Sequence, residues 1–507
     1  ELTLQTSGSF WSRFRILVKT NHEVTAINAS EKYVVVKNLI TGEERKESYD
    51  KLLLSPGAKP VKPNLSGIDS EKIFTLRTVE DTFIIHDYVE HTKPQSAVIV
   101  GGGYIGIEVA ENLREKGLDV TIVQRPAQLM NTLDYDMAAL VHSKLRERGV
   151  SLRLRSNVIG FREEHGRILT LLEGSQEIPA DMVLLAIGVV PENSLAKQAG
   201  LELGVKGSIV VTDRMETSIR DIFAVGDAVQ VKHFVTGEDT VIALAGPANK
   251  QGRIAADNIC GGDSHYRGSM GSSIIKIFDM TAAGTGLTEK AAKASGMDCE
   301  SVVLSPSSHA GYYPGAKTMT MKVVFEKDTL KLLGAQIIGT DGVDKRLDVL
   351  ATAIHCGMKA DMLRDLDLAY APPFSSAKDP VNMAGFMIEN IKNGTVKQYH
   401  WNEIESLPRD GSVTLLDTRT VHEYENGHIE GYVDIPVDDL RDRLNELDIN
   451  KPVYVMCQSG LRSYLACRIL TQNGFDCYNF SGGYRFYASV IQEKQMSECT
   501  YPCGMEK

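Results

Sequence analysis

Cys457 is the residue whose type and setting most directly predict chemistry. It ends the apolar run VYVM and opens the segment CQSGLRS, which contains Arg462 and leads into a predicted helix. A thiol in such a loop faces backbone N–H groups and a helix start, and both favour an anion. Because the thiolate is the reactive form of cysteine, we predict a nucleophile assisted by the permanent charge of Arg462. The alternative is a buried structural cysteine, which is our interpretation of Cys467 and Cys477.

A glycine-rich turn predicts a dinucleotide site. The apolar strand AVIV is followed by GGGYIG and a helix, so Gly101 permits a tight turn, Gly103 lets the backbone approach a pyrophosphate, and Gly106 allows close packing. An acidic residue that binds the ribose is expected about 20 residues further on. Gln124 and Arg125 stand there instead, and neither would repel a 2′-phosphate. We therefore expect NADPH to be accepted as well as NADH.

The region around Cys457 resembles the rhodanese sulfurtransferases. The matching segments are LLDTRTVHEYENGHIEG, CQSGLRS and FSGGYRFY. In that family a loop of four residues between cysteine and arginine suits a sulfur atom, and the resemblance implies a persulfide on Cys457. Asp417, Arg419 and His428, in the first segment, are expected to be structural rather than catalytic.

A second flavin signature follows the dinucleotide site. The segment TSIRDIFAVGDA resembles the strand that ends in an FAD-binding aspartate in two-dinucleotide-domain disulfide reductases. The resemblance implies that Asp227, between Gly226 and Ala228, binds the ribityl chain of FAD. A plain turn at the end of a strand is the alternative.

Two further segments, LAYAPPFSSAKDPVN and HAGYYPG, resemble coenzyme A–disulfide reductases and NAD(P)H-dependent persulfide reductases. In those families a tyrosine from each segment approaches the active-site sulfur of the partner subunit. The resemblance implies this role for Tyr312 and Tyr370, with Tyr313 as a competitor for the first. The alternative for these tyrosines is packing at a subunit interface. It also implies that Lys378, and less directly Lys19, contacts coenzyme A.

The flavin disulfide reductases begin with their own strand–glycine turn–helix unit for FAD, and the coenzyme A branch then has a single redox cysteine. The 507 residues contain neither feature, and no cysteine precedes Cys260. We expect an N-terminally truncated chain rather than a degenerate natural protein. Because the flavin domain would lack a central strand, the chain as given is expected to bind FAD weakly or not at all.

The alternation of strands and helices predicts an α/β protein of several domains. The expected fold is a two-dinucleotide-binding-domain flavoprotein whose first βαβ unit is missing, with an α+β dimerisation domain and an α/β rhodanese domain. Helices are expected at 136–148, 343–356 and 440–447. The expected domains are 1–94 (partial FAD-binding), 95–190 (NAD(P)-binding), 191–262 (second FAD-binding part), 263–395 (dimerisation), 399–490 (rhodanese) and 491–507 (tail).

Composition restricts the possible partners. A net charge of −11 argues against nonspecific nucleic-acid binding. No apolar run reaches the roughly 18 residues of a membrane span, and the first residues lack signal-peptide features. The eight scattered cysteines suggest reduced thiols and a cytoplasmic location. Cys499 and Cys503 are two exposed thiols or a resolving or metal-binding pair, but zinc needs four ligands, so no metal site is expected.

These motifs together predict an FAD-dependent oxidoreductase. It would reduce coenzyme A disulfide, coenzyme A persulfide or a related polysulfide with NAD(P)H, coupled to sulfur transfer at Cys457. The expected partners are small-molecule thiols or persulfides and a second copy of the chain in a homodimer. The alternatives are an NAD(P)H oxidase or peroxidase, and a sulfurtransferase on an inactive reductase scaffold. The sequence leaves open the preferred nicotinamide and the sulfur donor and acceptor.

Overall fold

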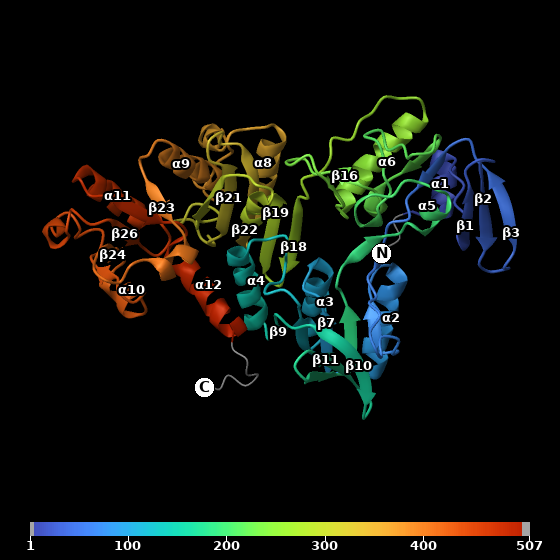
Figure 1. The fold of residues 1–507 in the computed structure, drawn as a ribbon, viewed down its shortest axis with the longest axis horizontal. Coiled ribbons are helices and arrows are strands. Elements are labelled where there is room, and N and C mark those ends of the chain that lie inside the picture. Colours follow the sequence, from blue (N-terminus) through green and yellow to red (C-terminus); the bar gives the residue numbers. More distant parts are fainter. Residues whose placement is uncertain (1–4, 499–507) are drawn as a thin grey trace. The chain divides into compact units, whose positions relative to one another are not determined.

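The computed structural model describes residues 5–498, which form two compact units. Within the described residues, the first unit comprises 5–59 and Val189–Ser269, and the second comprises Pro60–Gly188 and 270–498. Figure 1 traces the chain through both. Cys499 and Cys503 lie outside the described residues. No helix within residues 5–498 is long and apolar enough to cross a membrane.

The first unit contains an antiparallel three-stranded sheet and a short parallel pair of strands. The sheet consists of β1 (His22–Asn28), β2 (Tyr33–Asn38) and β3 (Glu44–Ser48). The parallel pair consists of β4 (Leu52–Leu54) and β15 (Ile222–Ala224). The helical elements are α1 (Ser7–Phe14), α5 (Ser194–Gln198), η1 (Val205–Gly207), η2 (Gly226–Ala228) and α6 (Ala245–Ile259). The small strands β16 (Val231–Lys232) and β17 (Asp239–Thr240) pair antiparallel.

The second unit begins with the βαβ unit that the glycine motif predicts. Five parallel strands are arranged in the order β6 (Ile73–Thr75), β13 (Met182–Leu185), β7 (Ser96–Val100), β8 (Asp119–Val123) and β9 (Ser151–Arg153). Its helices are α2 (Val79–Thr92), α3 (Tyr104–Glu115) and α4 (Tyr135–Glu147). A separate antiparallel sheet contains β10 (Val158–Glu164), β11 (Arg167–Leu172) and β12 (Gln176–Ala180). The central strands are buried and apolar because α3 and α4 cover one face of the sheet and the β10–β12 sheet covers the other.

An antiparallel sheet and two long helices follow. The strand order is β18 (Ser273–Ile277), β19 (Met280–Gly286), β22 (Leu332–Gly339), β21 (Thr320–Glu326) and β20 (Cys299–Leu304). The helical elements are α7 (Glu289–Ala294), α8 (Val343–His355), η3 (Ala360–Asp365) and α9 (Pro380–Lys392). Asp379 caps α9 with its carboxylate, and Pro380 is the first helical residue, where its missing N–H costs nothing.

The last part of the second unit is a parallel α/β sheet. Its strands are ordered β23 (Lys397–Tyr399), β27 (Cys477–Phe480), β26 (Val453–Met456), β24 (Thr414–Asp417) and β25 (Val433–Asp434). The helical elements are η4 (Trp401–Ser406), α10 (Val421–Glu425), η5 (Leu444–Glu446), α11 (Leu461–Gln472) and α12 (Gly483–Glu498). The helix expected at 440–447 is therefore wrong, because only η5 forms there.

The α12 helix packs against α4 (Figure 1), so the last sheet is joined to the dinucleotide-binding part of the unit. The guanidinium of Arg146 on α4 donates to both oxygens of the buried Glu493 carboxylate, at 3.0 and 3.1 Å. Burial alone would raise the pKa of Glu493, but His142 and Arg146 together lower it to about 2.

A buried lysine joins three parts of the second unit. Lys322 Nζ lies 2.9 Å from Asp136 and from Glu289, and 3.3 Å from Asp134. Trp401, at the start of η4, donates its indole N–H to Asp136 at 3.2 Å. Burial alone would lower the pKa of Lys322, but the three carboxylates raise it well above its ordinary value. The lysine therefore stays charged and holds the surrounding carboxylates together.

Candidate active sites

The sulfur of Cys457 lies inside a closed loop at the end of β26. The residue is fully buried, and two neutral donors point at its Sγ atom. The backbone N–H of Gly460 is 3.1 Å away, and the Ser463 hydroxyl is 3.3 Å away. The same hydroxyl lies 3.1 Å from the Gly460 carbonyl oxygen, so its single proton can be donated either to that oxygen or to Sγ, but not to both. A negative charge on sulfur would attract that proton.

The segment FSGGYRFY, which resembles the rhodanese family, holds the Cys457 loop through backbone hydrogen bonds. The Tyr484 N–H donates to the Cys457 carbonyl at 2.8 Å, and the Arg485 N–H donates to the Gln458 carbonyl at 3.2 Å. A Cβ atom on Gly483 would lie 2.6 Å from the backbone nitrogen of Ser459, so only glycine allows this approach.

Arg462 is not a lone charge beside the sulfur. Its two terminal nitrogens each donate at 2.7 Å to a different oxygen of Glu423, which lies on α10. These hydrogen bonds lower the pKa of Glu423 to about 2 and raise that of Arg462. The contribution of Arg462 to catalysis stays a prediction.

The three other residues of the rhodanese-like motif have structural contacts. Arg419 is buried and donates to the Asp417 carboxylate at 2.7 and 2.9 Å, and its guanidinium lies 3.9 Å from the Tyr484 ring centre. His428 stacks on Tyr424 with ring centres 4.0 Å apart. These contacts agree with the expectation that Asp417, Arg419 and His428 hold the domain together.

The structure brings Tyr312 and Tyr370 together. Their hydroxyl oxygens are 3.0 Å apart although the residues are far apart in sequence. This hydrogen bond raises the pKa of Tyr370. Tyr313 instead packs edge-on against the buried His309, with ring centres 5.8 Å apart. Both members of the hydroxyl pair are exposed, Tyr312 at 78%, so the pair is accessible to a ligand or a second subunit.

A buried arginine that the sequence did not single out holds the two tyrosine loops in place. Arg346 on α8 is 1% exposed. It donates to Asp379 at 3.0 and 3.2 Å, to Ser375 Oγ at 3.2 Å, and to the Ser308 carbonyl at 2.8 Å. One loop contains Ser308 and the other contains Ser375 and Asp379, so this single guanidinium fixes both. The signal available in the sequence was an arginine within a predicted helix, at 343–356. Its burial and its partners depend on the tertiary fold.

Lys378 and the Cys457 loop line the same cavity, which has a volume of about 670 Å³. One wall comes from the tyrosine loops and includes His309, Gly311, Ser376 and Lys378. A second wall is the apolar face of α9, with Met383, Phe386 and Met387. The third comes from the rhodanese-like region and includes Ser459, Gly460, Leu461, Tyr464, Asn479 and Phe480. The cavity thus extends from the coenzyme A lysine predicted here to the loop that surrounds Cys457.

The cavity contains one polar group without a hydrogen-bond partner. Asn479 is 6% exposed, and its Oδ1 atom accepts no hydrogen bond within residues 5–498. A buried acceptor of this kind costs free energy unless a ligand or water supplies a donor. Lys378, which lines another wall of the cavity, is exposed. Lys19 lies in the first unit, where it pairs with Glu47.

The glycine turn has the geometry that a dinucleotide needs. Gly101 has a φ of +110°, and a Cβ atom there would lie 2.2 Å from the Ala186 carbonyl oxygen. A Cβ on Gly106 would lie 2.1 Å from the Gly101 oxygen, whereas one on Gly103, which precedes α3, would meet nothing within 4 Å. Open space at a helix N-terminus suits a pyrophosphate. The residues present therefore fit a nicotinamide dinucleotide.

Gln124 and Arg125 follow β8 at the edge of this site. The Gln124 side-chain oxygen accepts a hydrogen bond from the Gly102 N–H at 3.0 Å, so it helps to fix the glycine turn. Arg125 is exposed. No carboxylate occupies the position where an NADH-specific site places one.

The FAD signature lies in the first unit. Gly226 has a φ of +80° and donates its N–H to the buried Gln251 side chain at 2.7 Å, which fixes the turn η2. Asp227 is half-buried and Ala228 is buried in the core of the unit. A half-buried carboxylate at the end of a strand can accept hydrogen bonds from ribityl hydroxyls, so these residues fit the flavin role.

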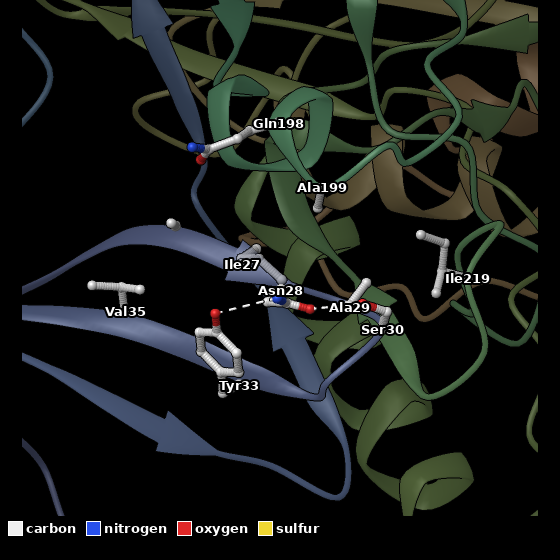
Figure 2. Close-up of a pocket in the computed structure, with 10 residues that line it drawn as sticks. Ile27, Asn28, Ala29, Ser30, Tyr33, Val35, Gln198, Ala199 and Ile219 are labelled. Carbon is white, nitrogen blue, oxygen red and sulfur yellow. Dashed lines mark hydrogen bonds between the residues drawn. The ribbon is translucent and has the colours of Figure 1, made fainter.

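A separate cavity in the first unit contains none of the predicted site residues. It has a volume of about 640 Å³ and is lined by the β1–β2 hairpin together with Gln198, Ala199 and Ile219. Figure 2 shows that Asn28 donates to the Tyr33 hydroxyl oxygen, at 3.2 Å, and accepts from Ser30, at 2.9 Å. These bonds stay within the hairpin, and nothing in the lining points to redox chemistry.

Comparison with known families agrees with this geometry. Residues 11–252 match the pyridine nucleotide-disulphide oxidoreductases, residues 272–380 match their dimerisation domain, and residues 400–489 match the rhodanese-like domain. The coenzyme A disulfide reductase of Staphylococcus haemolyticus is 35% identical over 76% of this chain and 86% of its own length. The chain belongs to the pyridine nucleotide-disulphide oxidoreductases. The predicted family, fold class and enzyme class are confirmed.

Two solved structures extend the likeness through the rhodanese-like region. Reduced Bacillus anthracis CoADR-RHD is 46% identical, with a TM-score of 0.94 over 97% of this chain and 88% of its own. An NAD-dependent persulfide reductase from A. fulgidus is 36% identical, with a TM-score of 0.89 over 96% and 88%. Membership of the family implies FAD and NAD(P)H as cofactors and a flavoprotein oxidoreductase with a dimerisation domain.

Proposed function

We propose that the protein uses NAD(P)H to reduce coenzyme A disulfide, coenzyme A persulfide or a related polysulfide, and that Cys457 carries the sulfane sulfur. The observation that supports this most strongly is the cavity shared by Lys378 and the Cys457 loop. Passage of sulfur between a thiol carrier and Cys457 requires that the two sites be adjacent, as they are in this cavity. Similar proteins are named as coenzyme A disulfide and persulfide reductases.

The walls of the cavity match the parts of a coenzyme A thiol. The apolar face of α9, with Met383 and Phe386, suits the alkyl portions of a pantetheine arm. Asn479 adds a polar side chain to the same lining. The exposed ammonium of Lys378 suits a phosphate. The proposed ligand thus matches the apolar wall and the charge of Lys378, and places its thiol toward the loop.

Sulfur transfer at Cys457 needs no redox partner. The Cys457 thiolate attacks the outer sulfur of a persulfide R–S–SH, the S–S bond breaks, and R–S⁻ leaves and takes up a proton. Gly460 N–H and the Ser463 hydroxyl stabilise the charge that remains on the bound sulfur. A coenzyme A thiolate can then remove that sulfur by the same reaction in reverse.

The tyrosine pair is proposed to serve the reductase reaction. Tyr312 and Tyr370 share one hydrogen bond, so either hydroxyl can donate a proton to a thiolate that leaves nearby. Bound FAD would pass reducing equivalents from the nicotinamide to the substrate sulfur. The dimerisation domain supports a homodimer in which the exposed tyrosines face a partner subunit.

Coenzyme A persulfide and glutathione persulfide together test the cavity assignment. Lys378→Met is expected to raise the KM for loading Cys457 from coenzyme A persulfide by about tenfold, the worth of one charged hydrogen bond. Loading from glutathione persulfide should change less than about twofold because that donor lacks the phosphates. The measurement is the mass of one added sulfur on the Cys457 peptide against donor concentration.

Lys392→Met is the matched control, because Lys392 is also on the surface of this region, near the end of α9, but it pairs with Asp361 and lies outside the cavity lining. It should leave both donors unchanged. Equal KM values for the two donors, unaffected by Lys378→Met, would contradict a coenzyme A site in the cavity.

We also propose that NADPH is accepted, with Arg125 binding its 2′-phosphate. Arg125→Gln is expected to weaken NADPH binding by about tenfold, the value of a charge-assisted hydrogen bond, and to change NADH binding less than about twofold. Calorimetric titration of both nucleotides checks this without any need for turnover. Arg162→Gln, at an exposed position of β10, is the control. A loss of affinity for both nucleotides would contradict the assignment.

An NAD(P)H oxidase is the competing function. A water-forming NADH oxidase from Lactobacillus brevis is 28% identical, with a TM-score of 0.70 over 74% of this chain. Oxygen consumption that needs no thiol substrate would favour this alternative. Sulfur transfer that needs Cys457 but no nicotinamide would favour a sulfurtransferase alone.

A further inference from the structure

The arginine of the sulfur loop is paired with a carboxylate. The two terminal nitrogens of Arg462 are both engaged, at 2.7 Å each, with the two oxygens of Glu423. This bidentate geometry is the strongest that an arginine and a carboxylate form, and it orients the planar guanidinium. The other arginine bonded to the loop, Arg485, makes that contact through its backbone N–H, and partial burial lowers the pKa of its side chain.

The groups that touch the sulfur itself are neutral within the described part of the chain. They are the Gly460 N–H and the Ser463 hydroxyl. The cavity beside the loop is walled by Leu461, Tyr464 and Phe480, which are apolar or aromatic. These two donors can stabilise one negative charge spread over sulfur. A second charge would need a cation, but the arginine of this loop, Arg462, is already engaged by Glu423, and Lys378 lines another wall of the cavity.

Sulfur donors differ in the charge that leaves. When the Cys457 thiolate takes sulfur from thiosulfate, the S–S bond breaks and sulfite leaves as a dianion. When it takes sulfur from an alkyl persulfide, the leaving group is a thiolate with a single charge at the reacting end. A dianion is stabilised best by a cation whose charge is not already neutralised by a carboxylate.

We propose that Glu423 is a specificity-determining and positioning residue: by engaging Arg462 it makes the site selective for alkyl persulfides over thiosulfate. This inference rests on the proposed sulfurtransferase function of Cys457 and names its donor class. The pKa of Glu423, lowered to about 2 chiefly by Arg462, keeps the pair fully ionised at neutral pH. The preference therefore persists across the physiological range.

The test is the ratio of kcat/KM for glutathione persulfide to kcat/KM for thiosulfate, with cyanide as acceptor. Reaction rates of Cys457→Ser are subtracted because persulfides react with cyanide unaided. The wild type should favour the persulfide by at least about tenfold, the value of one charge-assisted hydrogen bond. Glu423→Gln frees Arg462 and should lower the ratio by about tenfold, mainly through faster thiosulfate turnover. A merely structural role would slow both donors alike and leave the ratio unchanged.

Two further variants identify the cause. Glu425→Gln removes an exposed carboxylate from the same short helix and should keep the wild-type ratio. Adding Arg462→Gln to Glu423→Gln should abolish the gain with thiosulfate. A wild type that uses both donors equally, a ratio unmoved in Glu423→Gln, or the same shift in Glu425→Gln would overturn the inference while leaving Cys457 as the sulfur carrier. Wild-type transfer from neither donor would overturn the proposed function and the inference with it.

Discussion

Cys457→Ser is expected to lower sulfur transfer from glutathione persulfide to cyanide by at least about 10³-fold. Serine keeps the shape of the side chain and the hydrogen bond from Gly460, but its hydroxyl is not ionised at neutral pH and cannot hold a sulfane sulfur. The measurements are thiocyanate formation and the mass of one added sulfur on the protein. The fold should persist, because the loop is held mainly by backbone hydrogen bonds.

Cys467→Ala is the control for this prediction. Cys467 is buried on α11 in the same domain. A hydrogen bond with Cys477 and burial raise the pKa of Cys467 well above its ordinary value, so it stays an unreactive thiol. Its replacement should change transfer by less than about threefold. Transfer that survives Cys457→Ser, or an equal loss in Cys467→Ala, would place the nucleophile elsewhere.

Arg346→Met is expected to lower the free energy of unfolding of the second unit by about 3–5 kcal/mol. The variant leaves the buried Asp379 carboxylate without its guanidinium and removes the donor to the Ser308 carbonyl. Both tyrosine loops lose their common anchor, so the Tyr312–Tyr370 contact should loosen as well. Differential scanning calorimetry measures the first effect, and hydrogen exchange in the two loops measures the second.

Lys345→Met provides the comparison, since Lys345 also faces Asp379 but lies 3.8 Å away and is 37% exposed. It should cost at most about 1 kcal/mol. Burial raises the pKa of Asp379, but its hydrogen bonds and Arg346 lower it below 3.8 overall. The stabilisation is therefore complete above pH 3.8 and is lost as pH falls through the lower folded-state value. The difference in stability between each variant and the wild type should accordingly become smaller in acid, and equal losses at neutral pH would contradict the anchoring role.

Local sequence was sufficient where one segment determines its own conformation. The run AVIV-GGGYIG-IEVAENLREKG contains strand, turn and helix signals in order, and β7 and α3 form as expected. The segment at 440–447 was ambiguous. Its leucines have helical spacing, but successive three-residue turns from Pro436 to Glu446 bury Leu440 equally well. Only the short η5 results.

The candidate sites show a similar division. The Cys457 loop was recognisable because both groups that donate to its sulfur, Gly460 and Ser463, lie within seven residues of the nucleophile. Glu423 was not, because its partner Arg462 lies on another helix, and the pairing exists only in the folded domain. Arg346 and Asn479 went unnoticed for the same reason. Their significance comes from burial and from what faces them, which no local pattern records.

The most direct test of the central claim is anaerobic turnover of the native protein, purified from its own source with its flavin and supplied with NAD(P)H, a polysulfide and coenzyme A. Reduction of R–S–SH to R–SH and sulfide consumes one NAD(P)H. The account predicts one sulfide released for each NAD(P)H oxidised, with a large loss of rate in Cys457→Ser when polysulfide is the only sulfur source. NAD(P)H oxidation that requires oxygen and releases no sulfide would contradict it.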